Sequence, residues 1–407
     1  MSADQNTVPS HVPPELAMPF PLTSRQTSYV HPHKEIVPQI HKGPPIFFGT
    51  DVFPVPPRGC WVLTRAEDLK KVYENNVDFI KKGNSFFAPM IGESWDVIPT
   101  ELDPPKHTAF RRALEPGFSP REMSKQEAKI SSRASELINK FKDKGEVDFI
   151  KDFAVPFPVS IVLDLLGLPL DRMYEFLDWE YNLLHTSVPD DRRNAIATLK
   201  QFLYEEIEKR EENPTDDLIS RTMKLEAEGR PWTKEEVFGH CFNLFIGGLD
   251  TVTANLGFHF HHLATHLDDQ RLLREDPSRV EQGILELMRA YAAVTTIRVC
   301  KNEIKIHGVT IKPGDRVAMS TPLGSNDPAA FDSPLEVRLD RRPVHLSLGH
   351  GIHRCLGAHL ARRELKVAMQ DMLAMLPEFR VKPGFKVPFQ MTNVMHVMEL
   401  PLVWDPA

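Results

Sequence analysis

Hydrophobic and polar positions divide this chain into a long helical centre and shorter extended segments. From residue 119 to about 293, apolar residues recur every three or four positions, which is the spacing of one helix face. From about 47 to 63, aromatic and β-branched residues between Pro and Gly predict short strands. The segment 303–317 predicts two strands joined by a turn at Pro313-Gly314, and 394–404 predicts a final strand pair. The pattern favours a mainly α fold with a small β region drawn from both ends of the chain.

The N-terminal segment differs from the rest of the chain. Its first 20 residues are polar and rich in proline, so they bury little apolar surface, and we expect residues 1–20 to be disordered. No linker divides the remainder, and residues 21–407 are expected to form a single domain. Inside it, Thr233 and Glu236 have the spacing of a capping box and predict the start of a long apolar helix.

Composition narrows the classes of function. The chain is 41% hydrophobic, enough for a large core, and its net charge of −7 argues against wholesale nucleic-acid binding, which needs a basic field. No run of about 18 apolar residues predicts a membrane anchor. Four widely spaced cysteines without a C-x-x-C pair indicate neither a disulfide framework nor a zinc ribbon. We therefore expect a cytoplasmic monomer without a nucleic-acid or membrane partner.

One cysteine lies in a glycine-rich segment. Gly349, Gly351 and Gly357 surround Cys355, and a helical pattern follows from Leu360. Glycines allow a tight loop with positive φ, and a thiolate close to a helix N-terminus is stabilised by the helix dipole. Such a thiolate suits haem iron, to which it donates electron density that favours O–O cleavage. A buried inert cysteine is the plainer alternative, and a zinc cluster with nearby histidines lacks a fourth ligand.

A second unusual segment interrupts the long apolar helix. Gly247 and Gly248 each cost about 1 kcal/mol relative to alanine inside a helix. Asp250 and Thr251 then place polar groups in an apolar span, which is unfavourable unless they are hydrogen-bonded. Together they predict a locally opened helix in which the Thr251 hydroxyl donates to the carbonyl of Gly247. The alternative is a bent helix with a solvated aspartate.

These segments resemble a known family. The cysteine segment resembles the haem-binding loop of the cytochrome P450 superfamily, and the interrupted helix resembles its central helix; their sequences here are LSLGHGIHRCLGAHLARREL and LFIGGLDTVTANLGF. Two further segments, WDVIPTELDPP and LPLVWDP, are similar to the camphor-hydroxylating bacterial class of that superfamily. The resemblance implies the mainly α P450 fold, a triangular helical prism with a small β region. It also implies an O2-dependent haem b monooxygenase, with Cys355 as axial ligand of the iron. Asp250 would relay protons from solvent, and Thr251 would stabilise the oxygen intermediate. Leu348 stands where the family usually has Phe.

The same resemblance assigns supporting roles. His107, Arg111, Arg298 and His353 match positions that contact the haem propionates, although each alone is commonly a surface residue. Glu286 and Arg289, one helical turn apart, match a buried network behind the haem, whereas an isolated pair at this spacing is ordinary surface decoration. Its third member is an arginine, and three candidates stay open: Arg338, Arg341 and Arg342.

The pocket positions indicate the substrate class. By the resemblance, the pocket is lined by Phe86, Trp95, Val97, Asn243, Gly247, Val294 and Val394. Trp95 stands where camphor hydroxylase has a tyrosine hydroxyl donor, Asn243 replaces an apolar residue and Thr296 replaces an aspartate. A compact apolar pocket with one or two donors suits a bicyclic monoterpenoid with an ether or ketone oxygen, such as 1,8-cineole or a camphor relative. Alternatively, Trp95 only fills space.

Partners follow from the resemblance as well. Electrons would come from NADH through a reductase and a [2Fe–2S] ferredoxin, docked on a basic face near Cys355 that includes Arg111, Arg112, Arg342 and Arg354. Thr108 stands where camphor hydroxylase has another docking arginine. The lysine pairs at 70–71 and 81–82 are interpreted as solvated, and the histidines of 259–266 as a solvent-facing helix end. A haem-based sensor and a peroxide-driven haem-thiolate enzyme are the alternative functions.

Overall fold

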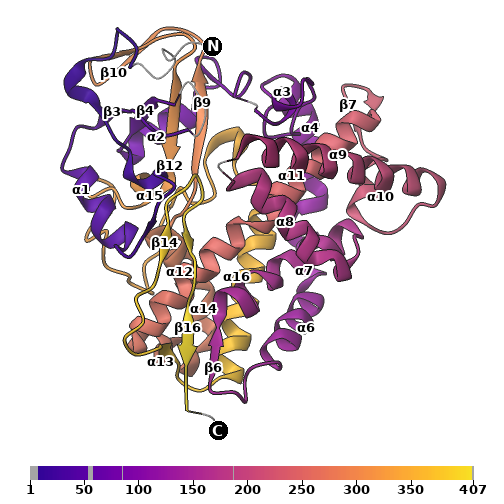
Figure 1. The fold of residues 1–407 in the computed structure, drawn as a ribbon, viewed down its shortest axis with the longest axis vertical. Helices are drawn as coiled ribbons and strands as arrows, with labels where there is room; N and C mark the ends of the chain where they lie inside the picture. The colour runs from indigo at the N-terminus through magenta and orange to yellow at the C-terminus, as the bar shows by residue number, and fades with distance from the viewer. Residues whose placement is uncertain (1–7, 54–57, 85, 187, 406–407) are drawn as a thin grey trace.

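The computed structural model describes residues 8–53, 58–84, 86–186 and 188–405. About 51% of the chain is helical and 12% is in strands, so the predicted mainly α fold is confirmed. In Figure 1 the largest sheet occupies one upper side of the molecule, and the longer helices fill the opposite side. No helix in the described ranges is both long enough and apolar enough to cross a membrane.

Two helices that meet end to end run through the helical part. The capping box begins α11 (Lys234–Leu249), since the Thr233 hydroxyl accepts from the Glu236 N–H, and α12 (Thr251–Thr265) follows after one residue. The helix α16 (Ala358–Met375) packs against α12. The other long helices are α6 (Glu127–Ile138), α7 (Pro156–Leu166), α8 (Met173–Leu184), α9 (Pro189–Glu212) and α14 (Val280–Ala290). The shorter helices are α1 (Val37–His41), α2 (Ala66–Glu74), α3 (Phe87–Met90), α4 (Lys106–Leu114), α5 (Pro120–Ser124), α10 (Leu218–Thr222), α13 (Leu267–Glu275) and α15 (Thr321–Ser325).

The largest sheet has six strands in the order β1-β3-β4-β12-β9-β5. Their bounds are β1 (Ala17–Met18), β3 (Ile46–Gly49), β4 (Cys60–Leu63), β5 (Phe79–Ile80), β9 (Thr295–Cys300) and β12 (Arg316–Ser320). The antiparallel pair β3–β4 confirms the strands predicted over 47–63. Because β5 pairs with β9 so that Ile80 lies opposite Val299, the fold brings Lys81 close to Arg298.

Small sheets complete the β region. They are β10 (Ile304–Ile306) with β11 (Val309–Ile311), β7 (Glu226–Ala227) with β8 (Arg230–Pro231), β13 (Arg380–Val381) and β6 (Glu146–Asp148) on either side of β16 (Pro401–Val403), and β2 (Thr27–Ser28) and β15 (His396–Val397) on either side of β14 (Phe389–Gln390).

Three sequence expectations differ from this structure. In the segment 303–317 the hairpin turn lies at His307-Gly308, both with positive φ, and Pro313-Gly314 instead joins β11 to β12. The strands of 394–404 do not pair with each other, because β15 pairs with β14 and β16 with β6 and β13. Residues 8–20, expected to be disordered, form a 3₁₀ turn and the strand β1, since the sheet edge gives them partners; residues 1–7 lie outside the described part.

The apolar core lies mainly around α11 and α12. Phe238, Phe242 and Phe245 of α11 are fully buried and belong to one large cluster of apolar side chains that extends through the helical part. A smaller cluster lies between the six-stranded sheet and α2. The central helix pair is therefore held rigidly on most of its surface, and the side that is left open borders a cavity.

Candidate active site

A cavity of about 440 Å³ lies between the α11–α12 pair and the loop before α16. Residues far apart in the sequence meet on its wall because the helix pair, the sheet edge and the cysteine loop converge there. Among the predicted site residues, those that line it are His107, Arg111, Asn243, Gly247, Asp250, Thr251, Val294, Arg298, His353, Cys355 and Val394.

The cysteine loop is held by its own backbone. The N–H of Cys355 donates to the carbonyl of Leu348 at 2.8 Å. Gly349 and Gly351 have φ of 70° and 68°, in the left-handed region that favours glycine. A Cβ on Gly351 would lie 2.5 Å from the carbonyl oxygen of Tyr73, so no larger residue fits there. The loop thus presents the side chain of Cys355 at the cavity wall.

The surroundings of Cys355 shift the pKa of its thiol in opposite directions. The side chain of Cys355 is exposed to the cavity, but the protein atoms around it still desolvate the thiol and raise its pKa, while the N–H of Gly357 and the charges of Arg111 and Arg354 lower that pKa. The net pKa is raised. The reactive thiolate form therefore depends on a further positive partner, such as an iron bonded to the sulfur.

Four nitrogen-bearing side chains gather at another part of the wall. Arg298 and Lys81 are buried, and burial lowers the pKa of Arg298 and brings that of Lys81 to about 7. The rings of His107 and His353 lie 4.1 Å apart, and both ring nitrogens of His107 and Nε2 of His353 are buried without a hydrogen-bond partner in the described part of the chain. Buried polar atoms of this kind need hydrogen-bond partners, and the charges of Arg298 and Lys81 favour an anionic one. Two propionates of a porphyrin whose iron faces Cys355 would fit them.

Lys81 is the residue that sequence analysis missed at this wall. The sequence predicts a solvated lysine pair at 81–82, but Lys81 is only 6% exposed, and its Nζ lies 3.3 Å from the carbonyl oxygen of Ile297. The cause is the pairing of β5 with β9, which turns the end of β5 toward Arg298. Nothing local distinguishes Lys81 from its neighbour Lys82, so only the strand pairing reveals it.

The central helix is interrupted where the sequence indicated. Asp250 separates α11 from α12, and the hydroxyl of Thr251 donates to the carbonyl of Gly247 at 3.1 Å. The side-chain amide of Asn255 donates to the carbonyl of Thr251 at 2.8 Å. The break between the two helices and these side-chain bonds therefore lie together beside the cavity.

Asp250 has partners that the sequence did not reveal. Its Oδ1 lies 2.9 Å from Nε2 of His396 and 3.4 Å from Nε2 of His185, and Glu180 lies 3.6 Å from the same nitrogen of His185. Burial raises the pKa of Asp250, but the two histidines outweigh it and hold that pKa below its usual range. Burial lowers the pKa of His185, but its contacts with Asp250 and Glu180 raise it to about 10.

Comparison with known proteins identifies the family. The family model described as cytochrome P450 matches residues 159–402. The chain belongs to the cytochrome P450 family. It is 38% identical over 405 residues to a relative named probable cytochrome P450 127A1, from Sinorhizobium fredii, covering 98% of this chain and 97% of that relative.

Solved structures of cytochromes P450 have the same fold. The crystal structure of cytochrome P450 CYP101C1 matches with a TM-score of 0.86 and 33% identity, covering 98% of this chain and 100% of that one. That of CYP101J2 matches with the same TM-score and coverage at 29% identity. The predicted fold, family and enzyme class are confirmed, and this P450 is a monooxygenase whose cofactor is haem b. The haem supplies the chemistry that activates dioxygen.

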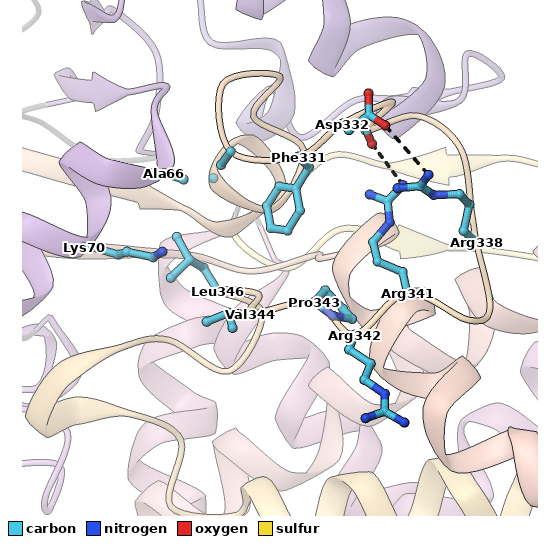
Figure 2. A pocket seen from close by; sticks show the side chains of 12 residues that line it. Ala66, Lys70, Phe331, Asp332, Arg338, Arg341, Arg342, Pro343, Val344 and Leu346 are labelled. Atoms are coloured by element: carbon cyan, nitrogen blue, oxygen red, sulfur yellow. Dashed lines mark hydrogen bonds and ion pairs between the residues drawn. The ribbon is translucent and has the colours of Figure 1, made fainter.

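A buried ion pair in this P450 supports the wall behind the cysteine loop. Glu286 and Arg289 are 0% exposed and joined by two hydrogen bonds of 2.8 Å, the bidentate arrangement of strong pairs. Of the three candidate arginines, Arg341 brings its guanidinium to Glu286, with Nε 3.5 Å from Oε1, while Arg338 contacts the same oxygen through its backbone N–H at 3.1 Å. Figure 2 shows Arg338 and Arg341 directed toward Asp332, with Arg342 pointing away. Arg341 is therefore the third member of the network.

Three predicted pocket residues do not line the cavity of this P450. The indole N–H of Trp95 donates to Glu93 at 2.8 Å, and the ring is packed in the core, so no donor is left for a substrate. Phe86 is 40% exposed, with its ring 4.1 Å from that of Phe87, and Val97 is buried in the core. The structure agrees with the alternative that Trp95 fills space, because a buried N–H takes the nearest carboxylate.

Proposed function

We propose that this P450 hydroxylates an unactivated C–H bond of a small bicyclic monoterpenoid that carries an ether or ketone oxygen, such as 1,8-cineole or a camphor relative. The observation that carries the proposal is the composition of the cavity wall near Gly247. Val294 and Val394 form a bridge between two chain segments there, so their side chains lie next to each other. The wall is mostly apolar, with few polar groups, and such a site selects compact apolar molecules. Its residues here include Leu244, Ile246, Gly247, Val252, Val294 and Val394.

Asn243 replaces Trp95 as the candidate donor to the substrate oxygen. The hydroxyl of Thr100 donates to Oδ1 of Asn243 at 2.8 Å, which orients the side-chain amide. Within the described ranges Nδ2 of Asn243 has no hydrogen-bond partner, and the residue lines the cavity. An amide N–H available in an apolar pocket recognises a ketone or ether oxygen and contributes about 1 kcal/mol to binding.

Substrate titrations test this role of Asn243. The spin-state change of the haem should report tighter binding of camphor and 1,8-cineole than of a saturated hydrocarbon of the same shape, by about fivefold. Asn243→Leu should remove this preference, whereas Trp95→Phe, the matched control, should keep it. A preference that persists in Asn243→Leu would show that another group recognises the oxygen.

The open turn of α11–α12 supports a role in proton delivery. Thr251 lines the cavity with its hydroxyl anchored to the carbonyl of Gly247, and Asp250 lies beside it with its carboxylate held by histidines. In this arrangement Asp250 takes protons from the outer side, and the Thr251 hydroxyl places a proton or a water at the oxygen-binding position. Thr251→Ala should keep haem and substrate binding but divert electrons to hydrogen peroxide, and Thr251→Ser should restore coupling. Unchanged product per NADH in Thr251→Ala would refute the role.

Cys355 is proposed as the thiolate ligand of the iron. The reduced protein exposed to carbon monoxide should show the shifted Soret band of thiolate-ligated haem, and Cys355→His should lose that band while still binding haem. His107, Arg111, Arg298 and His353 are proposed to hold the propionates, with Lys81 beside them. Arg298→Leu should then weaken haem retention, measured by transfer of haem to apomyoglobin, without moving the Soret band.

Electrons are proposed to come from NADH through a reductase and a [2Fe–2S] ferredoxin. Arg112, Arg342 and Arg354 are exposed, as an acidic partner requires. Arg111 donates to the carbonyl of Arg354 at 2.7 Å, which joins α4 to the cysteine loop. Arg112→Glu should slow ferredoxin-dependent reduction and Arg112→Lys should not, with the difference shrinking at high salt. NADH consumption that substrate does not increase would favour a haem-based sensor or a peroxide-driven enzyme.

A further inference from the structure

Two histidines and two carboxylates form a buried cluster beside the break between α11 and α12. Asp250 lies at the break, His185 and Glu180 come from the end of α8, and His396 begins β15. Their side chains are no more than 10% exposed. Three separate parts of the chain therefore direct ionisable groups into one small buried space.

The spacing of the donor atoms fits a metal ion. The ligand atoms of His185, Asp250 and His396 all lie within 4.8 Å of one another. In a tetrahedral zinc site with bonds of about 2.0–2.1 Å, neighbouring ligand atoms are about 3.3 Å apart. The observed distances of 2.9 Å from Asp250 to His396 and 3.4 Å from Asp250 to His185 lie on either side of that value. The third pair, His185 and His396, is bounded at 4.8 Å, so the two imidazoles would have to approach each other for an ion to bind all three side chains.

Several atoms of the cluster lack hydrogen bonds, although two of them lie within ion-pair distance of an oppositely charged group. Oδ2 of Asp250, Oε1 of Glu180 and Nε2 of His396 are buried and have no hydrogen bond in the described part of the chain. Nε2 of His396 is close to Asp250 but lacks hydrogen-bonding geometry to it. Leaving such groups unpaired is unfavourable, and coordination to a cation would satisfy them together. Zinc binding would release the proton of His185, and one divalent ion with two neutral histidines would then balance the charge of the two carboxylates.

We propose that His185, Asp250 and His396 form a binding site for a divalent transition-metal ion, with zinc as the preferred ion. Two imidazole nitrogens and one carboxylate oxygen are a donor set that zinc favours, and the fourth position is left for a water that Glu180 can accept a hydrogen bond from. Zinc in this site occupies the carboxylate that delivers protons, so it inhibits coupled turnover. This consequence, unlike the binding itself, rests on the proposed role of Asp250.

Direct binding of zinc to the haem-loaded enzyme tests the site. After removal of adventitious metal, titration with Zn²⁺ against a chelator should reveal one site tighter than micromolar. X-ray absorption at the zinc edge, which is separate from that of haem iron, should show nitrogen and oxygen ligands at about 2.0–2.1 Å and no sulfur. His396→Gln and His185→Gln should each weaken binding at least 100-fold.

A second histidine pair provides the matched control. His262 and His266 stack with ring centroids 4.1 Å apart, and His262 contacts Asp269, so His266→Gln removes an imidazole from a similar pair elsewhere. His266→Gln should leave the tight site unchanged. His396→Asn is a further variant in case His396→Gln loses its fold, which the carbon monoxide band and haem content report.

The outcomes separate the metal site from the proposed function. Absence of a tight site in the wild-type enzyme, or zinc affinity unchanged by His396→Gln and His185→Gln, overturns the metal site whatever the activity. Zinc that binds with the expected ligands and lowers product per NADH without changing substrate affinity supports both. Zinc that binds there but leaves coupling unchanged keeps the site and contradicts proton delivery through Asp250.

Discussion

Removing one charge from the buried pair of Glu286 and Arg289 should destabilise this P450 much more than removing an exposed charge. Both side chains are fully buried, and Arg289 also donates to the carbonyls of Ser325, Pro334 and Glu336 at 2.9 to 3.1 Å. The guanidinium therefore joins α14 to the segment that follows α15. Within the described ranges, the carboxylate of Glu286 is the one acidic group paired with this guanidinium.

The size of the effect follows from these contacts. Glu286→Gln leaves the Arg289 charge buried with carbonyl partners alone, and breaking a buried pair costs about 3–5 kcal/mol. Because three carbonyls still accept from Arg289, we expect the lower end, about 3 kcal/mol. Arg289→Met loses those hydrogen bonds as well and should cost about 4–5 kcal/mol. The double variant removes both charges of the pair and leaves Arg341 without Glu286, but Arg341 still donates to the carbonyls of Asp332 and Ser333. Its stability should therefore be close to that of Arg289→Met alone, a coupling of about 3 kcal/mol.

Urea unfolding of the haem-loaded protein measures these differences, followed by circular dichroism and by the Soret band. The control is Glu67→Gln, which removes the charge of an exposed pair with Lys71 and should change the midpoint little. A Glu286→Gln midpoint as close to wild type as that of Glu67→Gln would refute the reasoning. So would single-variant losses that simply add in the double variant.

Three further predictions concern the core and the central helix. Trp95→Phe removes one hydrogen bond to Glu93 and should lower stability by about 1 kcal/mol while leaving cineole affinity within about twofold; a tenfold loss would return Trp95 to the pocket. Gly248→Ala would place a Cβ 2.7 Å from the side chain of Val162 and should lower the melting temperature. The Cβ of Gly247→Ala would meet nothing within 4 Å, so this control variant should be tolerated. Equal melting temperatures of the two variants would contradict this packing. Burial lowers the pKa of His240 from 6.5 to about 4, so the stability tied to its neutral form is present above pH 6.5 and is lost as pH falls through 4. In unfolding experiments at pH 7 and pH 4, His240→Asn should reduce that loss by up to about 3 kcal/mol. The same pH dependence in His240→Asn and wild type would disprove this.

The features that the sequence alone determined are those whose partners lie within one or two helical turns. The Thr251 hydroxyl bonds the carbonyl four residues earlier, Glu286 pairs with Arg289 three residues later, and the turns around Cys355 use local glycines. Each is set by the geometry of a single backbone segment, so spacing was sufficient to predict it.

Other features were decided only by the tertiary structure, since their partners lie far apart in the chain. Strand pairing buries Lys81 near Arg298, and the meeting of α8, the helix break and β15 surrounds Asp250 with histidines. The indole N–H of Trp95 is not available to hydrogen-bond a substrate, because it donates to the carboxylate of Glu93 inside the core. A buried polar group binds whatever partner the packing brings within about 3 Å, and only the packed fold specifies that partner.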